Sequence, residues 1–154
     1  SMRTIAIEEH FLAKGFREIM QSDASSQGDG LNPTLIAKLT DLGSMRLKDM
    51  DRNGIDLQVI SDIGSSLAPR SGDEGVQLTR ESNDQVAEAC AAHPDRFAGF
   101  ATLQMPEPGA GVDDLERAVH SLGLKGAMIF GAGAYGIAVV ALLGLPETVG
   151  RELT

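Results

Sequence analysis

The chain has 154 residues, of which 42% are hydrophobic and 23% charged, and it carries a net charge of −9. This composition is typical of a globular protein with one apolar core, so we predict a single domain over residues 2–154. The negative charge disfavours nucleic acids and anionic membrane surfaces as partners, because both repel an acidic protein.

The first predicted element is a strand that turns polar towards its end. Residues 4–11 form an apolar run of strand length that includes Glu8, Glu9 and His10 near its close. In a regular strand Glu8 and His10 point to one face and Glu9 to the other. A carboxylate and an imidazole side by side suit Zn²⁺, Mn²⁺ or Fe²⁺. The pair also arises by chance, and two ligands do not complete a metal site, so the spacing alone leaves this role open.

A loop and two helices are expected next. Residues 21–32 are rich in serine, glycine and aspartate and predict a long exposed loop. Asn32-Pro33 predicts the cap and first turn of a helix. A second helix is expected over about residues 45–52, and it ends at Asn53-Gly54.

Polar residues follow the second predicted strand. Residues 55–61 are rich in β-branched side chains and predict this strand. The polar residues could line a pocket or form an ordinary turn, and we favour the turn. They are Ser61, Asp62, Ser65 and Ser66.

The rest of the chain continues the alternation of helix and strand. Helices are predicted over residues 76–92 and 112–122, and strands over residues 97–103 and 124–130. Strands without clean polar alternation, separated by helices, predict an α/β fold with a parallel sheet covered by helices. The pattern alone does not distinguish a barrel from an open sheet.

Six acidic residues are interpreted as helix-face or cap residues without a catalytic role, and two histidines as structural or solvent-facing. They are Asp49, Asp51, Asp56, Asp113, Asp114, Glu116, His93 and His120. The lone cysteine, Cys90, cannot form an internal disulfide, which suits a reducing compartment and predicts a cytoplasmic protein.

The C-terminal region, residues 131–154, points to no chemistry of its own. Its glycines lack the spacing of a dinucleotide-binding loop, and no Walker motif is present, so no nucleotide cofactor is predicted. Its apolar run over residues 137–143 is far shorter than the roughly 20 residues that cross a membrane. We therefore predict no membrane partner.

Four segments, taken in order, resemble one enzyme family. They read IAIEEHF, RLKDMDRNGIDLQVIS, TRESNDQVAEACAAHPDRFAGFATLQMPEP and LGLKGAMI. Together they are similar to the amidohydrolase-related decarboxylases of the amidohydrolase superfamily, and most of all to the γ-resorcylate and 2,3-dihydroxybenzoate decarboxylases. The resemblance covers about residues 3–129, and residues 131–154 do not align with the family.

The resemblance implies a fold, a cofactor and a reaction. The fold is the N-terminal part of a (β/α)8 TIM barrel, with Glu8 and His10 as two ligands of a divalent metal, zinc or manganese. The reaction is the nonoxidative decarboxylation of a small aromatic carboxylic acid whose carboxylate and ortho-hydroxyl bind the metal. The family's further ligands, a His and an Asp that donates the proton, have no match here, so no catalytic residue is assigned. Family members also imply a homo-oligomer.

Two alternatives remain open at this stage. The same first-strand motif serves hydrolases of cyclic esters and amides, which makes a metal-dependent amidohydrolase or lactonase the enzymatic alternative. A complete barrel needs about 250 residues, so a catalytically inactive barrel fragment with a structural or interaction role is the other.

Overall fold

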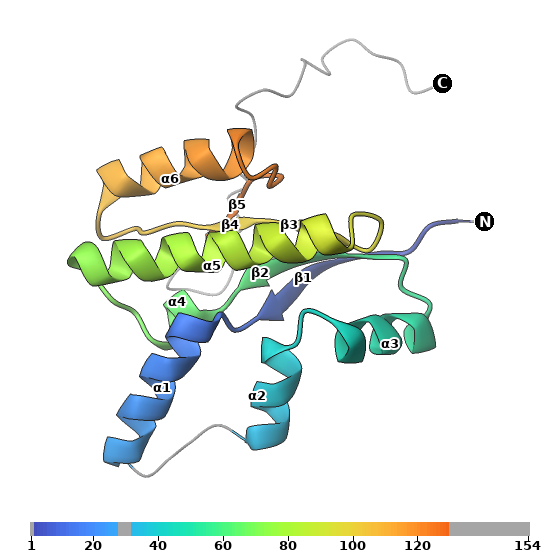
Figure 1. Cartoon of the computed structure of the whole chain (residues 1–154), viewed down its shortest axis with the longest axis horizontal. Coiled ribbons are helices and arrows are strands. Elements are labelled where there is room, and N and C mark those ends of the chain that lie inside the picture. Colours follow the sequence, from blue (N-terminus) through green and yellow to red (C-terminus); the bar gives the residue numbers. More distant parts are fainter. Residues whose placement is uncertain (1, 28–31, 130–154) are drawn as a thin grey trace.

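The computed structural model describes residues 2–27 and 32–129 and shows strands and helices in alternation (Figure 1). In chain order the elements are β1 (Ile5–Phe11), α1 (Lys14–Gln27), α2 (Pro33–Thr40), α3 (Ser44–Asn53), β2 (Leu57–Asp62), α4 (Gly64–Leu67), α5 (Gly72–Ala92), β3 (Phe97–Gly99), β4 (Ala101–Thr102), α6 (Pro108–His120) and β5 (Ala127–Met128).

All strand pairs in the described part of the chain are parallel, as predicted. β1, β2 and β3 form one ladder in that order, and β4 pairs with β5 in a second. Only Phe100 separates β3 from β4, and its backbone N–H donates to the Ile60 carbonyl at 3.0 Å. One nearly continuous stretch of chain therefore pairs with β2 through β3 and with β5 through β4.

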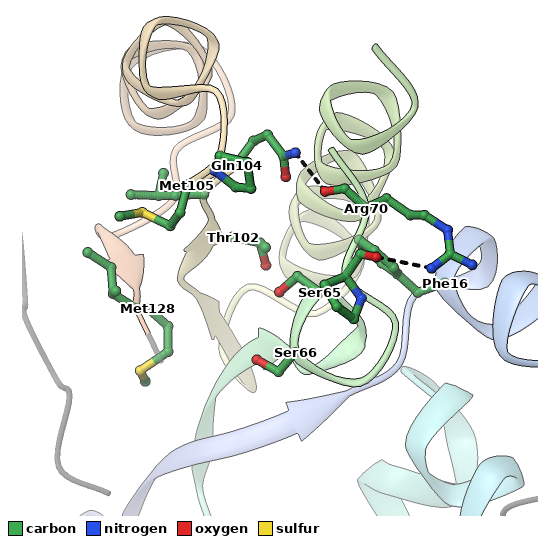
Figure 2. Close-up of a pocket in the computed structure, with 12 residues that line it drawn as sticks. Phe16, Ser65, Ser66, Arg70, Thr102, Gln104, Met105 and Met128 are labelled. Carbon is green, nitrogen blue, oxygen red and sulfur yellow. Dashed lines mark hydrogen bonds between the residues drawn. The ribbon is translucent and has the colours of Figure 1, made fainter. Parts of the chain in front are cut away.

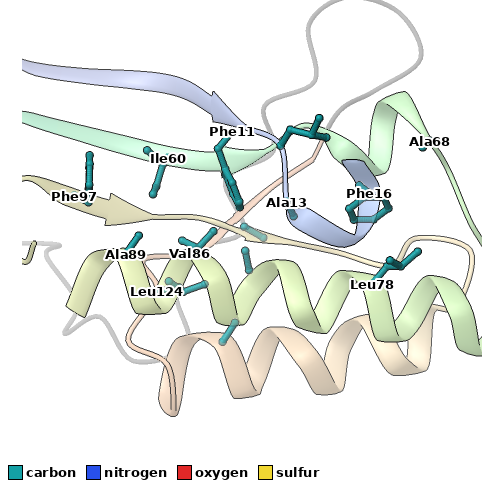
Figure 3. Close-up of a cluster of buried hydrophobic side chains, with 14 of the residues drawn as sticks. Phe11, Ala13, Phe16, Ile60, Ala68, Leu78, Val86, Ala89, Phe97 and Leu124 are labelled. Atoms are coloured by element: carbon teal, nitrogen blue, oxygen red, sulfur yellow. The ribbon is translucent and has the colours of Figure 1, made fainter. Parts of the chain in front are cut away.

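The apolar core lies between the strands and the long helices. Figure 3 shows Ile60 and Phe97 on the strands facing Val86 on α5, with Leu124 beside them. A methyl group added at Gly99 would overlap Val86 Cγ1. This close approach of strand to helix explains why a glycine occupies the position.

The two faces of the sheet differ in what they contact. Ile60 is buried in the core beneath α5, so its neighbour Ser61 belongs to the opposite face of the same strand. In the ladder His10 is the partner of Ser61, and Phe11 is the partner of Asp62. His10 and Ser61 therefore share the face turned away from the core.

The predicted start of α2 and the predicted end of α3 agree with the structure. The Asn32 side chain accepts a hydrogen bond from the Thr34 N–H at 2.8 Å, and Pro33 opens α2. α3 ends at Gly54, which adopts a left-handed backbone with φ 66°. Both predictions are confirmed, because caps act within a few residues of sequence.

Two boundaries differ from the predictions. The expected loop at residues 21–32 is helical as far as Gln27. Phe16, Ile19 and Met20 in the first part of α1 pack on the core, and the helix continues from there into the polar segment. Tertiary packing extends a helix into a segment of weak propensity. α5 begins at Gly72, earlier than expected, with two acidic residues in its first turn that favour the helix dipole.

Two predictions about the C-terminal region have different outcomes. Of the strand expected over residues 124–130, only Ala127 and Met128 form a ladder. The region 131–154 lies outside the described residues.

No helix of residues 2–27 and 32–129 is long and apolar enough to cross a membrane.

Candidate functional site

A pocket of about 410 Å³ lies where several parallel strands end (Figure 2). Phe16 of α1 and two serines of α4, Ser65 and Ser66, line it together with Thr102 at the end of β4 and Met128 of β5. In parallel α/β sheets the carboxyl ends of the strands carry the functional sites. Its position at the strand ends makes this pocket the candidate ligand site.

The pocket combines hydroxyl groups with an apolar wall. Figure 2 shows the hydroxyls of Ser65, Ser66 and Thr102 in the same region as the side chains of Met105 and Met128. Hydroxyls both donate and accept hydrogen bonds, while thioether and methyl groups contact a flat ring. The arrangement suits a small molecule with a flat apolar body and polar substituents.

Arg70 borders this pocket, but its charge is engaged elsewhere. Its Nη2 donates to Asp23 Oδ2 at 2.8 Å, and its Nη1 donates to the Pro69 carbonyl at 3.0 Å. Its backbone carbonyl accepts from Gln104 Nε2 at 2.8 Å, which holds the two edges of the pocket together. Figure 2 shows the guanidinium directed away from Met128.

His10 is held on two sides. Its Nδ1 lies 3.1 Å from Ser61 Oγ, and its backbone carbonyl accepts from Arg46 Nη2 at 2.8 Å. Ser61 and Asp62 belong to β2 itself, and both are buried. Interpreting these two residues as turn residues was therefore wrong, while Ser65 and Ser66 do line the pocket.

Glu8 has an unusual backbone. Its φ is 63°, and it lies where the register of β1 against β2 shifts, between Ala6 and Glu9. A left-handed backbone costs a residue with a side chain roughly 1–2 kcal/mol, and such strain concentrates at functional sites. The bulge interrupts the regular alternation by which Glu8 and His10 were expected to share a face. The role of both as metal ligands stays a prediction.

The donors at β1 fit a divalent metal in kind but not in number. Glu8 offers an exposed carboxylate and His10 an imidazole, and both groups are usual metal ligands. The contact of His10 Nδ1 with a hydroxyl is the kind of second hydrogen bond that orients a metal-binding histidine. Within residues 2–27 and 32–129 no group of three or more His, Cys, Asp or Glu could hold an ion. Further ligands would have to come from outside these residues.

Asp62 is a fully buried carboxyl at the end of β2. Its Oδ1 accepts from the Ala13 N–H at 2.9 Å, which joins the loop after β1 to β2. Burial raises the pKa of Asp62, and hydrogen bonds from the backbone of Ala13, Gly64 and Ser65 and from Ser82 oppose this rise. Ser82 lies against Asp62, yet Asp62 Oδ2 and Ser82 Oγ have no partner of good hydrogen-bond geometry in the described part of the chain.

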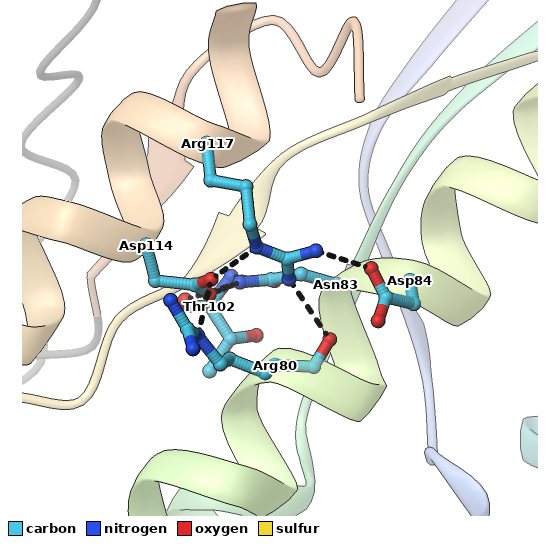
Figure 4. Close-up of polar contacts among 6 residues, drawn as sticks. All are labelled: Arg80, Asn83, Asp84, Thr102, Asp114 and Arg117. Carbon is cyan, nitrogen blue, oxygen red and sulfur yellow. Dashed lines mark hydrogen bonds and ion pairs between the residues drawn. The ribbon is translucent and has the colours of Figure 1, made fainter. Parts of the chain in front are cut away.

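Sequence reasoning missed a buried network between α5 and α6 (Figure 4). Asp114 was interpreted as a helix-face residue, which is wrong, because only 2% of it is exposed. Its carboxylate accepts from Arg117 Nε at 2.7 Å, Arg80 Nε at 3.2 Å and Asn83 Nδ2 at 2.6 Å. Asn83 also bonds both backbone groups of Thr102, at 2.8 and 3.0 Å. The network therefore positions a residue of the pocket.

Cys90, the two histidines and the other five acidic residues have structural or solvent-facing surroundings. Cys90 is half-buried, and burial raises the pKa of its thiol to about 11, so it stays protonated and unreactive at neutral pH. The ring of His93 meets Phe97 edge-on at 5.7 Å. The remaining residues of that group are exposed: Asp49, Asp51, Asp56, Asp113, Glu116 and His120.

Comparison with known proteins supports the resemblance noted in the sequence. A family model described as amidohydrolase matches residues 38–146, which extends past the last aligned segment. The γ-resorcylate decarboxylase of Rhizobium sp. (strain MTP-10005) is 34% identical over 128 residues, which are 82% of this chain and 38% of the relative. The chain thus spans well under half the length of this relative.

Solved structures agree with this match. The 5-carboxyvanillate decarboxylase of Sphingomonas paucimobilis superposes with a TM-score of 0.76 at 27% identity, over 84% of this chain and 43% of that one. The dihydroxybenzoic acid decarboxylase of Polaromonas sp. JS666, with bound manganese and the inhibitor 2-nitroresorcinol, gives 0.71 at 32% identity, over 85% and 39%.

Proposed function

The chain belongs to the amidohydrolase family, and on that premise we propose that it supplies the N-terminal part of a metal-dependent, nonoxidative decarboxylase of hydroxylated aromatic acids. One observation carries the proposal. The curated relative and both solved structures reported above are decarboxylases of such acids, and they match more than four fifths of this chain.

In this proposal the described strands are the first part of a (β/α)8 barrel. They are parallel and follow one another in chain order within each ladder, and helices separate them except at β3 and β4, which only Phe100 divides. This alternation is typical of the first half of such a barrel. β1 and β5 each have one strand partner among the described residues. The remaining strands would pair at these two edges.

Glu8 and His10 would hold a divalent ion, manganese or zinc, together with ligands outside the described residues. Manganese has direct support from the bound ion in the Polaromonas structure. Zinc has support only from ligand chemistry. When bound, the ion would polarise the carboxylate and ortho-hydroxyl of the substrate.

The pocket would hold the substrate ring. Met105 and Met128 would contact its faces, and the hydroxyls of Ser65, Ser66 and Thr102 would bond its polar substituents. In the reaction the bond between ring carbon and carboxylate breaks, its electron pair stays on the ring carbon, and a proton replaces the released CO2. The proton donor is not among the residues assigned here.

The direct test is an assay of the purified full chain with manganese for CO2 release from 2,6-dihydroxybenzoate, with a lactone as the competing substrate. We expect CO2 release that is lost in His10→Ala and unchanged in His120→Ala, an exposed histidine. Ring opening of the lactone without CO2 release would favour the hydrolase alternative. No turnover and no metal binding would favour a structural or interaction role.

Two further features belong to the same proposal. The resemblance to the amidohydrolase-related decarboxylases implies assembly with other copies of the chain. A homo-oligomer is expected, and light scattering would measure it. A cytoplasmic location fits the single cysteine, which forms no disulfide.

A further inference from the structure

Ser61 and His10 are neighbours on adjacent strands although 51 residues separate them in sequence. The ladder pairs them directly, so both side chains lie on the same face of the sheet. Ser61 Oγ lies 3.1 Å from His10 Nδ1. Only 1% of Ser61 is exposed, which limits the access of competing water to its hydroxyl.

We infer that Ser61 is a positioning residue that fixes the ring orientation and tautomer of His10 for metal binding. The inference rests on the proposed function, since it assumes that His10 is a metal ligand. Ser61 itself would not contact the metal.

The chemistry of imidazole gives the reason. A neutral imidazole carries one N–H and one lone pair, and a metal needs the lone pair. Because Nδ1 is engaged by Ser61, a metal would bind through Nε2. The proton then sits on Nδ1 and is donated to Ser61 Oγ, an arrangement in which a partner on the second nitrogen orients the ligand.

Arg46 supports the same residue through the backbone. Its Nη2 donates to the His10 carbonyl at 2.8 Å, and its Nε donates to the Asp41 carbonyl at 2.8 Å. Its Nη1 reaches Gln58 Oε1 at 3.3 Å on β2. The guanidinium thus ties β1, beside the strained Glu8, to the next strand and to the segment before α3. The ring and the carbonyl of His10 are held by different elements.

Metal affinity gives the first test. Titration of the full chain with Mn²⁺ and Zn²⁺ should show affinity about 10- to 100-fold lower in Ser61→Ala, the range found when such a supporting partner is lost. Ser61→Thr, which keeps a hydroxyl, should restore most of it. The control is Ser121→Ala, which deletes an exposed serine hydroxyl at the end of α6, away from β1 and β2. Its affinity should equal that of the parent.

The second readout needs no metal. Ring ¹⁵N NMR of the metal-free chain at about pH 8, where an ordinary histidine is neutral, should show the His10 proton on Nδ1. In Ser61→Ala the population should shift towards the Nε2–H tautomer. His93 and His120, the other two histidines of the chain, serve as internal references whose tautomers should not change.

The outcomes separate this inference from the proposed function. If the parent chain binds metal but Ser61→Ala binds it equally well, or His10 keeps its tautomer, the positioning role is wrong while the proposed function stands. If the parent binds neither ion, the metal-dependent function and the positioning role both fail. Lower affinity together with a tautomer shift, both restored in Ser61→Thr, supports the inference.

Discussion

Two buried carboxyls lie against successive residues of α5, and they are stabilised in different ways. Asp62 is 0% exposed and lies against Ser82, while Asp114 is 2% exposed and accepts from Asn83. Asp114 is paired with two arginines. The groups that act on the pKa of Asp62 are backbone N–H groups and a serine, with no cation among them.

The difference shows two ways in which a carboxyl group can be buried. A buried charge with cationic partners and full hydrogen bonding is stable as an ion. A buried carboxyl without a cation favours its neutral form. Asp114 joins α5 to α6, whereas Asp62 lies at the strand ends that carry the pocket.

The largest effect is expected from Asp114→Ala. The substitution leaves Arg80, Arg117 and Asn83 without their shared acceptor, and we expect a loss of about 3 kcal/mol in the free energy of unfolding. Urea denaturation measures it. The control is Asp113→Ala, an exposed neighbour on the same helix, with an expected change within about 0.5 kcal/mol. Equal losses at the two positions would show that the network adds nothing to the free energy of unfolding.

Asn83→Ala should have the next largest effect. It removes the bond to Asp114 and both bonds to the backbone of Thr102, at an expected cost of about 2 kcal/mol. Because Asn83 and Asp114 contact each other, the double variant should lose less than the sum of the two single losses. Strict additivity in urea unfolding would contradict a shared network. Asn53→Ala, at an exposed position of α3, is the surface control.

Asp62→Asn tests the other carboxyl through pH. The raised pKa means that the folded state holds the proton more tightly than the unfolded state, whose ordinary value is 3.8. The resulting stability is fully present below that value and is lost as pH rises through the folded pKa. Relative to Asp62→Asn, the parent should therefore lose stability above about pH 4, by at most about 1.4 kcal/mol per pH unit. If urea unfolding at several pH values shows that the parent keeps or gains stability relative to Asp62→Asn as pH rises, the backbone hydrogen bonds dominate.

Glu8→Gly should have the smallest effect, and it should be stabilising. Glycine tolerates the left-handed backbone at this position, so relief of strain should exceed its entropic cost by about 0.5 kcal/mol. Glu9→Gly, at a position without positive φ, should instead destabilise the chain by up to about 1 kcal/mol. Thermal unfolding measures both. A gain in stability that accompanies loss of metal binding would indicate strain kept for function.

Local features of the sequence predicted much of the fold. The cap at Asn32-Pro33, the helix end at Gly54 and the order of strands and helices followed from residues close together in the chain. The family was evident from short segments and is supported by the comparisons. These features were accessible because caps, turns and hydrophobic periods act over a few residues.

The details of the candidate site were not accessible in this way. The type and spacing of Glu8 and His10 suggested metal ligands, but the bulge at Glu8 depends on pairing with β2. The Ser61–His10 contact spans 51 residues, and the Asn83–Asp114 bond spans 31. The sequence by itself determined the order of the strands and of most helices, although not α1 or α4. The tertiary structure alone decided which polar side chains are buried, paired or strained, because those properties depend on contacts between distant parts of the chain.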